Sequence, residues 1–486
     1  MTMCKLIIKD EVNIKIDGLP LEARRKLVST FKYEDPTARY RPAYKLGRWD
    51  GSVSLFGLGG AGYLSQLEKI IEVLDKFNIQ IQDIEDHREK IDLNFSTVSE
   101  DFWGEKTWPD GHRFAGEKIR LRDDQVEVVN KFLENPQCIQ EIATGFGKTI
   151  TTATLSKICE KYGRTITIVP NKSLVEQTEE DFRNVDLDVG VYYGDRKELG
   201  RTHTICTWQS LNILDKKSKN QEQDILTLAE FLDGVKTVIV DEVHMAKADV
   251  LKKLLTQNLN NATIRWGLTG TIPKEPYENE QIFASLGPVI HKVSAHELQE
   301  KGVLSNCHVN IIQLVDLLEF KSYADELKFL VTDKSRMLYI SEMIQKISLN
   351  GNTLVLVNRI DSGKLLTENL ENSVFISGDV KTKERKEEYD DVKTSDNKII
   401  VATYGVAAVG INIPRIFNLV LLEPGKSFVR VIQSIGRGIR RAEDKDFVQI
   451  WDLTSTCKYA KKHLTERKKF YKEAKYPFQI EKIDWK

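Results

Sequence analysis

The stretch Ala143-Thr144-Gly145-Phe146-Gly147-Lys148-Thr149 decides how this chain folds. An apolar run precedes it and a helical pattern follows it, so its glycines let backbone N–H groups close on a phosphate at the positive end of a helix. Lys148 would reach the β and γ phosphates of a nucleoside triphosphate, and the Thr149 hydroxyl would bind Mg²⁺. Ile142 stands where the full GxxxxGK[ST] pattern has its first glycine, and a lone GKT can also be a surface turn.

The stretch Val238-Ile239-Val240-Asp241-Glu242-Val243-His244 strengthens the phosphate interpretation. It predicts an apolar strand that ends in two adjacent carboxylates, which are costly there unless they serve a cation. Asp241 would hold Mg²⁺ through water, and Glu242 would orient and deprotonate the attacking water. A solvated acidic turn is the alternative, and the GKT upstream makes it the minority reading.

The pattern around these two stretches predicts an α/β fold. After Gly116, short β-branched runs alternate with amphipathic helical segments, which is typical of parallel sheets covered by helices. TITIVP, THTICTW, TVIVDEVH and IRWGLTGT form a first block, and NTLVLVN, SVFISGD, KIIVATYG, FNLVLLEP and FVQIWDL a second. The segment HELQEKGVLSNCHVNII between them resembles a crossover. A chain of 486 residues suggests three domains. We place them at 1–115 (small, α+β, nucleic-acid-binding), 116–300 (ATP-binding) and 301–486 (C-terminal), with the polar segment 87–114 as a linker.

Composition excludes several classes of protein. With 41% hydrophobic and 29% charged residues, the chain is expected to be globular, and no apolar run is long enough to span a membrane. The six cysteines form no CxxC pair, which argues against a zinc knuckle or a disulfide framework. We therefore expect a cytoplasmic protein, in the host cytoplasm if a phage encodes it. A net charge of -1 means that nucleic-acid contacts must come from local basic patches.

The DEVH sequence at 241–244 resembles the DExH box of superfamily 2 helicases, and the other motifs of that family follow in order between residues 118 and 455. LRDDQ (121–125) resembles the adenine-reading segment, PNKSLVEQ (170–177) motif Ia, TWQS (207–210) a strand-contacting motif, and LTGT (268–271) motif III. AT (402–403) through GINIP (410–414) resembles motif V, and QSIGRGIR (433–440) motif VI. The resemblance implies two tandem RecA-like domains, the use of ATP and Mg²⁺, and ATP hydrolysis that drives movement along nucleic acid.

The resemblance also implies roles for further residues, some within the phosphate and acidic stretches and some outside them. Those expected to bind ATP are Gln125, Thr144, Gly145, Gly147, Gly410, Asn412 and Gln433. Those expected to contact nucleic acid are Pro170, Thr207, Gln209 and Thr403, and those expected to couple hydrolysis to movement are His244, Thr269 and Thr271. Many relatives carry an acid where this chain has Asn412, so we expect a weakened ribose contact there.

Two arginines in motif VI complete the predicted catalytic set. Arg437 and Arg440 lie three residues apart, on one face if the segment is helical. Reaching across from the second block, they would neutralise charge on the γ-phosphate as arginine fingers do. A basic helix surface is the alternative, since Arg441 adds another charge. The prediction places ATP between two lobes whose closing and opening is the motor stroke.

The N-terminal segment RYRPAYKLGRWDG (39–51) interleaves cations with aromatic residues. Arg41, Arg48 and Trp49 are predicted to grip phosphates and to stack at a duplex end. An alternative of equal weight is that Tyr44 and Trp49 fill the core of a small domain. The segment is similar to the N-terminal domain of bacteriophage UvsW-type helicases. That similarity implies branched DNA as the partner, RNA–DNA hybrids included, and recombination or replication proteins as further partners.

Four functions follow from these patterns. The leading one is an ATP-dependent DNA helicase or branch-migration translocase. The alternatives are the motor of a restriction or nuclease system, an RNA helicase and a nucleotide-switched DNA clamp. A basic C-terminal segment (Lys458, Lys461, Lys462, Arg467, Lys468 and Lys469) is expected to be the solvated face of a helix, with a duplex-gripping surface as the minor reading.

Overall fold

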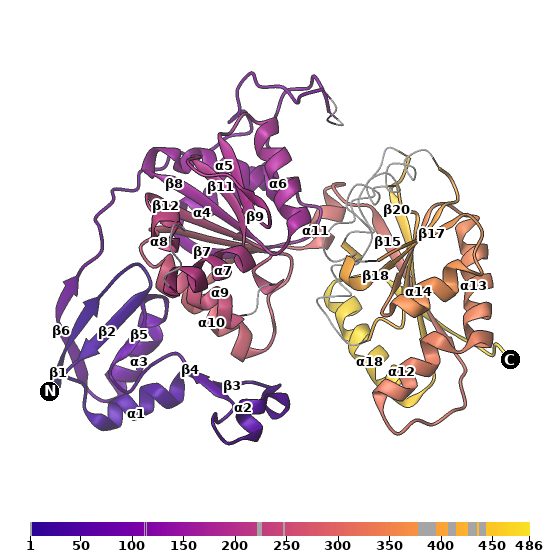
Figure 1. Cartoon of the computed structure of the whole chain (residues 1–486), viewed down its shortest axis with the longest axis horizontal. Helices are drawn as coiled ribbons and strands as arrows, with labels where there is room; N and C mark the ends of the chain where they lie inside the picture. The colour runs from indigo at the N-terminus through magenta and orange to yellow at the C-terminus, as the bar shows by residue number, and fades with distance from the viewer. Residues whose placement is uncertain are drawn as a thin grey trace. The chain divides into compact units, whose positions relative to one another are not determined.

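The computed structural model describes residues 2–110, 112, 114–220, 226–245, 248–377, 395–406, 415–425, 435–436 and 444–486. Contacts divide the chain into two compact units: residues 1–142 with 147–292, and residues 143–146 with 293–486. Each unit is built around its own large sheet of mainly parallel strands (Figure 1). The predicted α/β fold with parallel sheets is therefore confirmed. The division into three domains stays a prediction.

Residues 2–86 form a small α+β layer within the first unit. β1 (Thr2–Ile8) pairs antiparallel with β2 (Asn13–Asp17) and parallel with β6 (Ile79–Asp86), and β5 (Ala61–Tyr63) completes a sheet in the order β5-β2-β1-β6. Helices α1 (Leu21–Thr30) and α3 (Leu67–Lys76) contribute Leu27 and Ile70 to its core beside Phe31 and Phe56. Because alternate residues of β2 are buried, this sheet has one core face.

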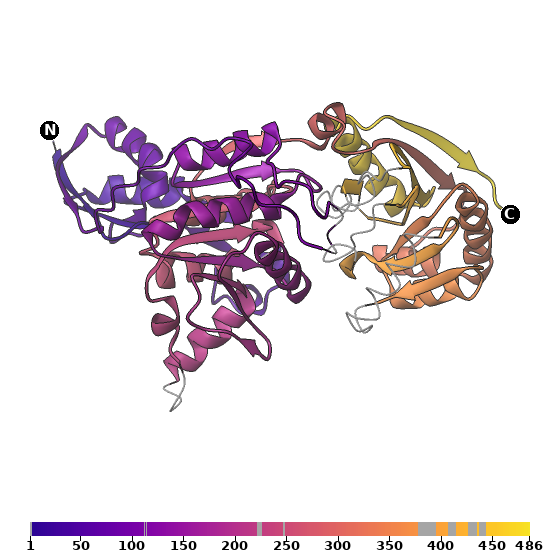
Figure 2. The ribbon, with the colours of Figure 1, turned by 90° about the horizontal axis from the view of Figure 1, so that it is seen from above.

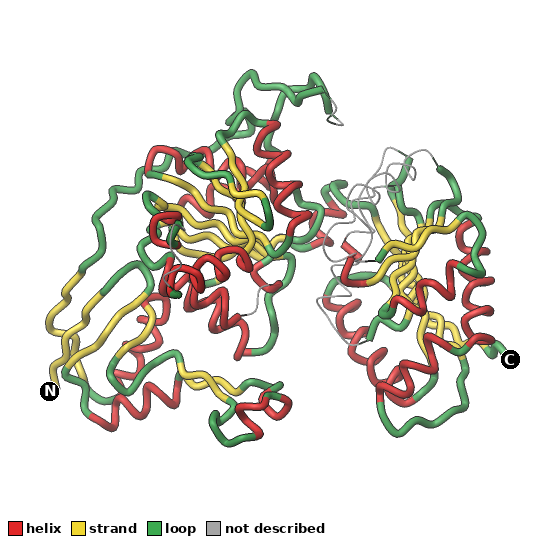
Figure 3. The backbone as a smooth tube through the Cα atoms, viewed as in Figure 1, coloured by secondary structure: helices red, strands yellow, loops and turns green. Residues whose placement is uncertain are grey.

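A two-stranded ribbon extends from this layer. β3 (Lys32–Glu34) pairs antiparallel with β4 (Ser52–Ser54), and Figure 3 shows the ribbon reaching away from the four-stranded sheet. Between the two strands lie a 3₁₀ turn, η1 (Ala38–Tyr40), and a single-turn helix, α2 (Pro42–Lys45). We call residues 35–51 the N-terminal loop.

The large sheet of the first unit has the order β10-β9-β11-β8-β12-β13-β7-β14. Its strands are β7 (Gln137–Ile142), β8 (Arg164–Val169), β9 (Val189–Tyr193), β10 (Arg196–Lys197), β11 (His203–Thr207), β12 (Val235–Asp241), β13 (Ile264–Thr269) and β14 (Val289–Val293). The central strands from β9 to β7 are parallel to one another. Their carboxyl ends therefore meet at one edge, which is where open α/β sheets bind ligands.

Helices cover both faces of this sheet (Figure 2). α7 (Trp208–Lys219), α8 (Leu228–Leu232), α9 (Ala248–Lys253) and α10 (Pro276–Leu286) share one apolar cluster with Ile166, Ile168, Val238 and Val240. α4 (Asp123–Glu134), α5 (Lys148–Cys159) and α6 (Lys172–Asn184) pack against one another and against the strands. α5 is buried over most of its surface, so its threonines turn inward, and Thr152 Oγ1 donates to the Lys148 carbonyl at 2.9 Å.

The sheet of the second unit has the order β17-β18-β16-β19-β20-β15-β21, and every neighbouring pair is parallel. Its strands are β15 (Asn306–Leu314), β16 (Thr353–Val357), β17 (Ser373–Ile376), β18 (Ile399–Thr403), β19 (Asn418–Leu422), β20 (Phe447–Ser455) and β21 (Phe478–Ile483). Helices among the described residues of this unit include α11 (Ala295–Glu300), α12 (Tyr323–Thr332), α13 (Lys334–Ser348), α14 (Ile360–Thr367) and α18 (Lys458–Glu473). α13 supplies Met337, Ile340 and Ile344 to the core.

The segment predicted as an aperiodic linker is packed in part against the first unit. Trp103 is 6% exposed and donates from Nε1 to Thr154 Oγ1 on α5 at 3.2 Å. Val98 is buried, and its N–H donates to the side chain of Asn130 on α4. Single apolar residues without periodicity produce no helix or strand pattern, so the sequence does not reveal this packing. No helix among the described residues is long and apolar enough to cross a membrane.

Candidate functional site

The loop between β7 and α5 has the backbone of a phosphate site. Gly145 and Gly147 have φ angles of 90° and 91°, which residues with a side chain rarely adopt. Gly147 is the N-cap of α5. A Cβ atom on Gly147 would lie 2.7 Å from Gln125 Nε2, so a larger residue here would displace the end of that side chain. The first N–H groups of α5 have no partner within the helix and carry its positive dipole end. The loop therefore fits a bound triphosphate.

Two carboxylates from the end of β12 meet Lys148 at the start of α5. Lys148 Nζ lies 2.7 Å from Glu242 Oε1 and 3.9 Å from Asp241 Oδ1. The side chains of Lys148 and Glu242 are each 10% exposed, and that of Asp241 is 16% exposed. Water and salt therefore screen their interactions less than those of surface pairs. Glu242 has a φ of 51°, and its N–H donates to Asp241 Oδ1 at 2.9 Å. The structure thus brings together the predicted phosphate lysine and both predicted acids.

The predicted adenine-reading residue lies beside this loop. Gln125 is 3% exposed, and its Oε1 accepts the N–H of Arg122 at 3.0 Å. Asp124 is also buried and holds the Arg122 guanidinium through bonds of 3.0 and 3.1 Å, which orders the start of α4. The sequence analysis did not single out the Arg122–Asp124 pair, although both residues lie in the quoted LRDDQ motif.

The three predicted coupling residues are connected to Glu242. His244 Nδ1 lies 2.6 Å from Thr269 Oγ1 and 3.5 Å from Glu242 Oε2. Thr269 Oγ1 donates to the Thr271 carbonyl at 2.8 Å, and the Gly270 N–H approaches Glu242 Oε2 at 3.4 Å. The ends of β12 and β13 are therefore joined by polar contacts that include one candidate catalytic group.

Comparisons with known proteins agree with this geometry. Residues 118–274 match the family model "Type III restriction enzyme, res subunit", and residues 335–442 match "Helicase conserved C-terminal domain". The chain is 24% identical over 463 residues to the ATP-dependent DNA helicase uvsW of Enterobacteria phage T4, covering 90% of this chain and 88% of that protein. It is 24% identical over 380 residues to the DNA 3'-5' helicase XPB of Kineococcus radiotolerans, covering 75% of this chain and 65% of that one.

This chain is a superfamily 2 helicase. More closely, it is an ATP-dependent DNA helicase of the kind that includes UvsW and XPB. Its fold is also that of a fragment of a putative HsdR subunit of a type I restriction enzyme from Vibrio vulnificus YJ016. The TM-score is 0.55 at 17% identity, covering 74% of this chain and 67% of that one.

Three of the residues that the helicase motifs place on nucleic acid lie side by side. β8 and β11 are parallel neighbours with Val169 opposite Thr207, so Pro170 and Thr207 follow at the same edge of the sheet. Gln209 Nε2 donates to the Pro170 carbonyl at 2.9 Å. Pro170 and Thr207 are buried, and Thr207 Oγ1 caps α7 by accepting the Ser210 N–H. Gln209 is exposed, so it is the member of this group best placed to reach a ligand.

The large sheet of the second unit contributes Thr403 to the described site residues, in addition to Thr144 and Gly145 of the phosphate loop. Thr403 ends β18, is half-buried, and its Oγ1 approaches the Val406 N–H at 3.4 Å. The other predicted residues of motifs V and VI lie outside the described residues: Gly410, Asn412, Gln433, Arg437 and Arg440. Their roles stay predictions.

The N-terminal loop does not use its aromatic residues as a core. Tyr44 is 43% exposed, so it does not fill the interior of the small layer. Trp49 is half-buried and its Nε1 donates to the Ser52 carbonyl at 2.7 Å. Arg48 is exposed, whereas the Arg41 guanidinium lies 2.8 Å from Asp35 Oδ2. Arg48 is therefore better placed than Arg41 to meet a phosphate.

Proposed function

We propose that this helicase moves along DNA and remodels branched structures. The proposed reactions are fork reversal, branch migration of Holliday junctions, and unwinding of D-loops and R-loops in phage recombination, replication and repair. The observation that carries the proposal is the exposed N-terminal loop, which presents Arg48 and Tyr44 on the same unit as Lys148 and the DEVH strand. Exposed cations beside aromatic rings suit a phosphate backbone whose bases are unpaired at a junction.

The contact between Lys148 and Glu242 suggests how nucleotide binding prepares hydrolysis. Glu242 cannot accept a proton from water efficiently while its Oε1 lies 2.7 Å from the Lys148 ammonium. A triphosphate offers Lys148 a more highly charged partner at the start of α5. Lys148 would then leave Glu242, which becomes available as the general base for the attacking water.

Other residues would support that step. When bound, Mg²⁺ would supply positive charge against the phosphates, and Asp241 with Thr149 would hold it. Gln125 would bind the adenine edge, and Gly145 and Gly147 would donate their N–H groups. Arg437 and Arg440 are proposed to neutralise charge on the γ-phosphate.

Movement would follow from the contacts of Glu242 with the motif III segment. A shift of Glu242 toward water changes its contacts with His244 and Gly270, which join it to β13. Gln209 and Thr403 are each proposed to contact the DNA backbone while these contacts change. Opening a duplex costs roughly 1.4 kcal/mol per base-pair step, so exchange of equal duplexes needs little work per step.

The proposal is tested by comparing substrates under one set of conditions. Purified helicase is given ATP with a forked DNA duplex, a Holliday junction, an RNA duplex and a linear blunt DNA duplex, and strand products are separated on gels. We expect the fork and the junction to be processed, with Lys148→Ala as the inactive control. Processing of the RNA duplex alone would instead support an RNA helicase. ATP hydrolysis with no strand product on any substrate would support a DNA clamp.

The N-terminal loop is tested separately. Arg48→Ala with Trp49→Ala is expected to weaken binding to forks by about 10-fold and binding to single strands by less, because the loop is proposed to meet the junction. Fluorescence anisotropy with both DNAs measures this difference, and thermal melting checks the fold, since Trp49 also bonds within the loop. An equal loss on both DNAs would assign the loop to general binding or folding.

A second candidate function is the motor of a restriction system, which the match of residues 118–274 to the "Type III restriction enzyme, res subunit" model favours. Such a motor is proposed to move along duplex DNA without needing a branch. Displacement of a triplex-forming strand from a linear duplex, at a rate equal to junction processing, would support it over the proposed function.

A further inference from the structure

Arg41 is held by a buried carboxylate at the start of the N-terminal loop. Its Nη2 lies 2.8 Å from Asp35 Oδ2, and the Asp35 side chain is 2% exposed. The other oxygen of Asp35 accepts the N–H and the hydroxyl of Thr37, each at 2.7 Å. A buried carboxylate needs such partners, because an uncompensated charge in that position is strongly destabilising. The Asp35 contact therefore fixes where the Arg41 guanidinium lies.

The same guanidinium reaches the helix that follows the DEVH motif. Arg41 Nη1 lies 3.5 Å from Asp249 Oδ2 on α9, which begins seven residues after Asp241. Arg41 also lies over the Trp49 ring, 5.3 Å from its centroid, so it connects the two ends of the loop. One side chain thus joins the loop to an element that leaves the candidate ATP site.

α10, the helix that follows motif III, converges on the same place. Its buried Tyr277 has a raised pKa, first because of burial and then because of the Asp249 charge, with Arg41 acting in the opposite direction. The pKa of Glu278 on α10 is raised by burial first, and Glu275 and Asp35 add to it. The charge of Arg41 therefore acts on Tyr277 of α10 as well as on its ion-pair partners Asp35 and Asp249.

We propose that Arg41 is a positioning residue that ties the N-terminal loop to α9, which packs against α10, so that changes at the nucleotide reach the loop. The proposal rests on the proposed function, because it concerns how that loop responds to ATP. Arg41 acts through Asp249 and does not contact DNA phosphate. A direct phosphate contact, which the sequence pattern alone predicts for Arg41, is the competing role.

Salt dependence separates the two roles. A phosphate contact releases about one counterion, so its loss lowers the slope of log Kd against log salt by about 0.9. Arg41→Ala is expected to leave this slope unchanged for a forked duplex. It is expected to lower ATP turnover at saturating DNA by about fivefold while basal turnover is kept. Arg48→Ala is the matched control from the same loop, and it should lower the slope and keep turnover at saturating DNA.

A mutant cycle tests the partner. Asp249→Asn keeps the Arg41–Asp35 pair and is expected to lower DNA-stimulated turnover as Arg41→Ala does. The double variant should be no worse than either single variant, because both remove the same link. A lower salt slope for Arg41→Ala, or losses that add in the double variant, would overturn the proposal.

Two controls separate the possible failures. If thermal melting shows that Arg41→Ala is unfolded, Asp249→Asn alone tests the proposed connection between the loop and α9. Unchanged DNA-stimulated turnover in Asp249→Asn would then overturn the proposal. If the unaltered helicase shows no DNA-stimulated turnover, the proposed function fails, and the link falls with it. Stimulated turnover in the unaltered helicase with a lower slope for Arg41→Ala refutes the link alone.

Discussion

Glu242 in the first unit and Glu423 in the second occupy matching places in their sheets. Glu242 follows β12, which lies between β8 and β13, and Glu423 follows β19, which lies between β16 and β20. Both are buried, and both have left-handed backbones, with φ angles of 51° and 43°. Such a conformation costs a non-glycine residue on the order of 1–3 kcal/mol and persists where the surroundings enforce it.

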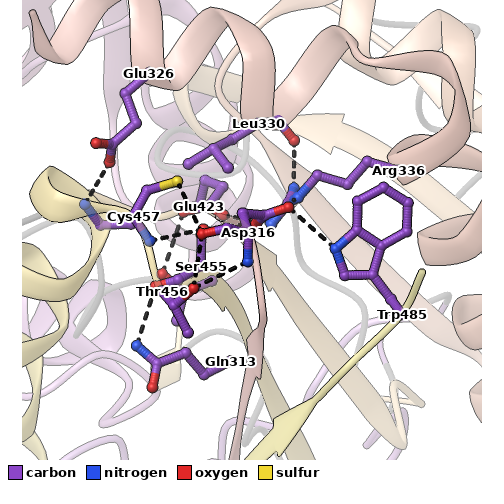
Figure 4. A network of polar contacts seen from close by, with 12 residues as sticks. Gln313, Asp316, Glu326, Leu330, Arg336, Glu423, Ser455, Thr456, Cys457 and Trp485 are labelled. Carbon is purple, nitrogen blue, oxygen red and sulfur yellow. Dashed lines mark hydrogen bonds and ion pairs between the residues drawn. The ribbon is translucent and has the colours of Figure 1, made fainter. Parts of the chain in front are cut away.

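The two glutamates differ in what surrounds them. Glu242 touches Lys148, whose position at the start of α5 suits it to a ligand. Glu423 lies in a closed polar network (Figure 4). Its Oε1 accepts from Arg336 Nη2 at 3.0 Å, and Arg336 also bonds to Asp316. Asp316 in turn accepts from Trp485 Nε1 at 3.0 Å.

The charges around Glu423 are balanced within its network, which leaves no net positive charge there for a further anion. Arg336 and Arg467 face the acids Asp316 and Asp452, so an ionised Glu423 would be a third negative charge against two positive ones. Burial raises the pKa of Glu423 to about 7, with Arg336 acting in the opposite direction. We infer that the left-handed backbone at the strand end has a different role in each unit. At Glu242 it holds a side chain that can give up Lys148 when a ligand binds, and at Glu423 it holds a side chain in a rigid network.

Lys148→Ala gives the largest effect that this comparison predicts. Without the ammonium, the phosphates lose the cation at the start of α5 and Glu242 loses its contact with Lys148, so DNA-stimulated ATP turnover should fall about 1,000-fold. A coupled-enzyme assay measures turnover, and filter binding should show DNA affinity largely kept. Lys157→Ala, at the other end of α5, is the matched control and should keep full turnover. Turnover retained in Lys148→Ala would refute the assignment of the phosphate loop.

Glu242→Gln should act on hydrolysis and spare nucleotide binding. The amide keeps the size of the side chain but accepts no proton, so turnover should fall by about 100-fold or more. Bound ATP should persist unhydrolysed, which rapid filtration with labelled ATP measures. Glu180→Gln, an exposed residue of α6, is the control. Release of product at the normal rate would remove Glu242 from the proposed mechanism.

Thr269→Val should have a smaller effect, on coupling. The variant keeps the shape but loses the hydroxyl that lies 2.6 Å from His244 Nδ1. The same hydroxyl donates to the Thr271 carbonyl, so at least two hydrogen bonds worth about 1 kcal/mol each are lost, and we expect at least about a fivefold fall in base pairs unwound per ATP. Parallel measurements of unwinding and turnover give this ratio. An equal fall in turnover and unwinding would mean that the contact supports catalysis instead of coupling.

The same contrast explains what the sequence could predict. The phosphate loop and the DEVH strand are local patterns, so their elements and the meeting of Lys148 with the two acids follow from strand order and parallel pairing. The sequence pattern predicts a crossover over HELQEKGVLSNCHVNII, but the structure forms the strand β15 over most of its second half. The strand pattern NCHVNIIQL was missed because it directly follows a helical pattern.

Buried charges were beyond prediction. Arg467 belongs to a segment expected to be a solvated face, yet it is 1% exposed and bonds to Asp452 at 2.8 and 2.9 Å. Arg336 reaches Glu423, which is 87 residues away in the chain. A single sequence shows charged residue types at such positions but not their distant partners, and charged residues are usually exposed. The contact of Arg41 with Asp249, which lies far along the chain, also could not be predicted, because a single sequence does not show distant partners.

Glu423→Gln should produce the smallest change in activity and a distinct change in stability. The amide can still accept from Arg336 and donate to Thr454, so turnover at pH 7 should stay within about twofold of normal. In the folded helicase, the pKa of Glu423 is raised from 4.5 to about 7, so the fold binds a proton that the unfolded chain has released between these pH values. Stability therefore falls as pH rises through this window.

The glutamine variant removes that dependence. Each pKa unit corresponds to about 1.4 kcal/mol, so the group can remove roughly 3 kcal/mol at most between pH 4.5 and 7. Denaturation midpoints measured from pH 5 to 8 should therefore fall more steeply for the unaltered helicase than for Glu423→Gln. Glu481→Gln, an exposed residue of the same unit, should follow the unaltered protein. Parallel curves for all three proteins would mean that Glu423 is ionised in the fold, and the two glutamates would then differ in geometry but not in charge.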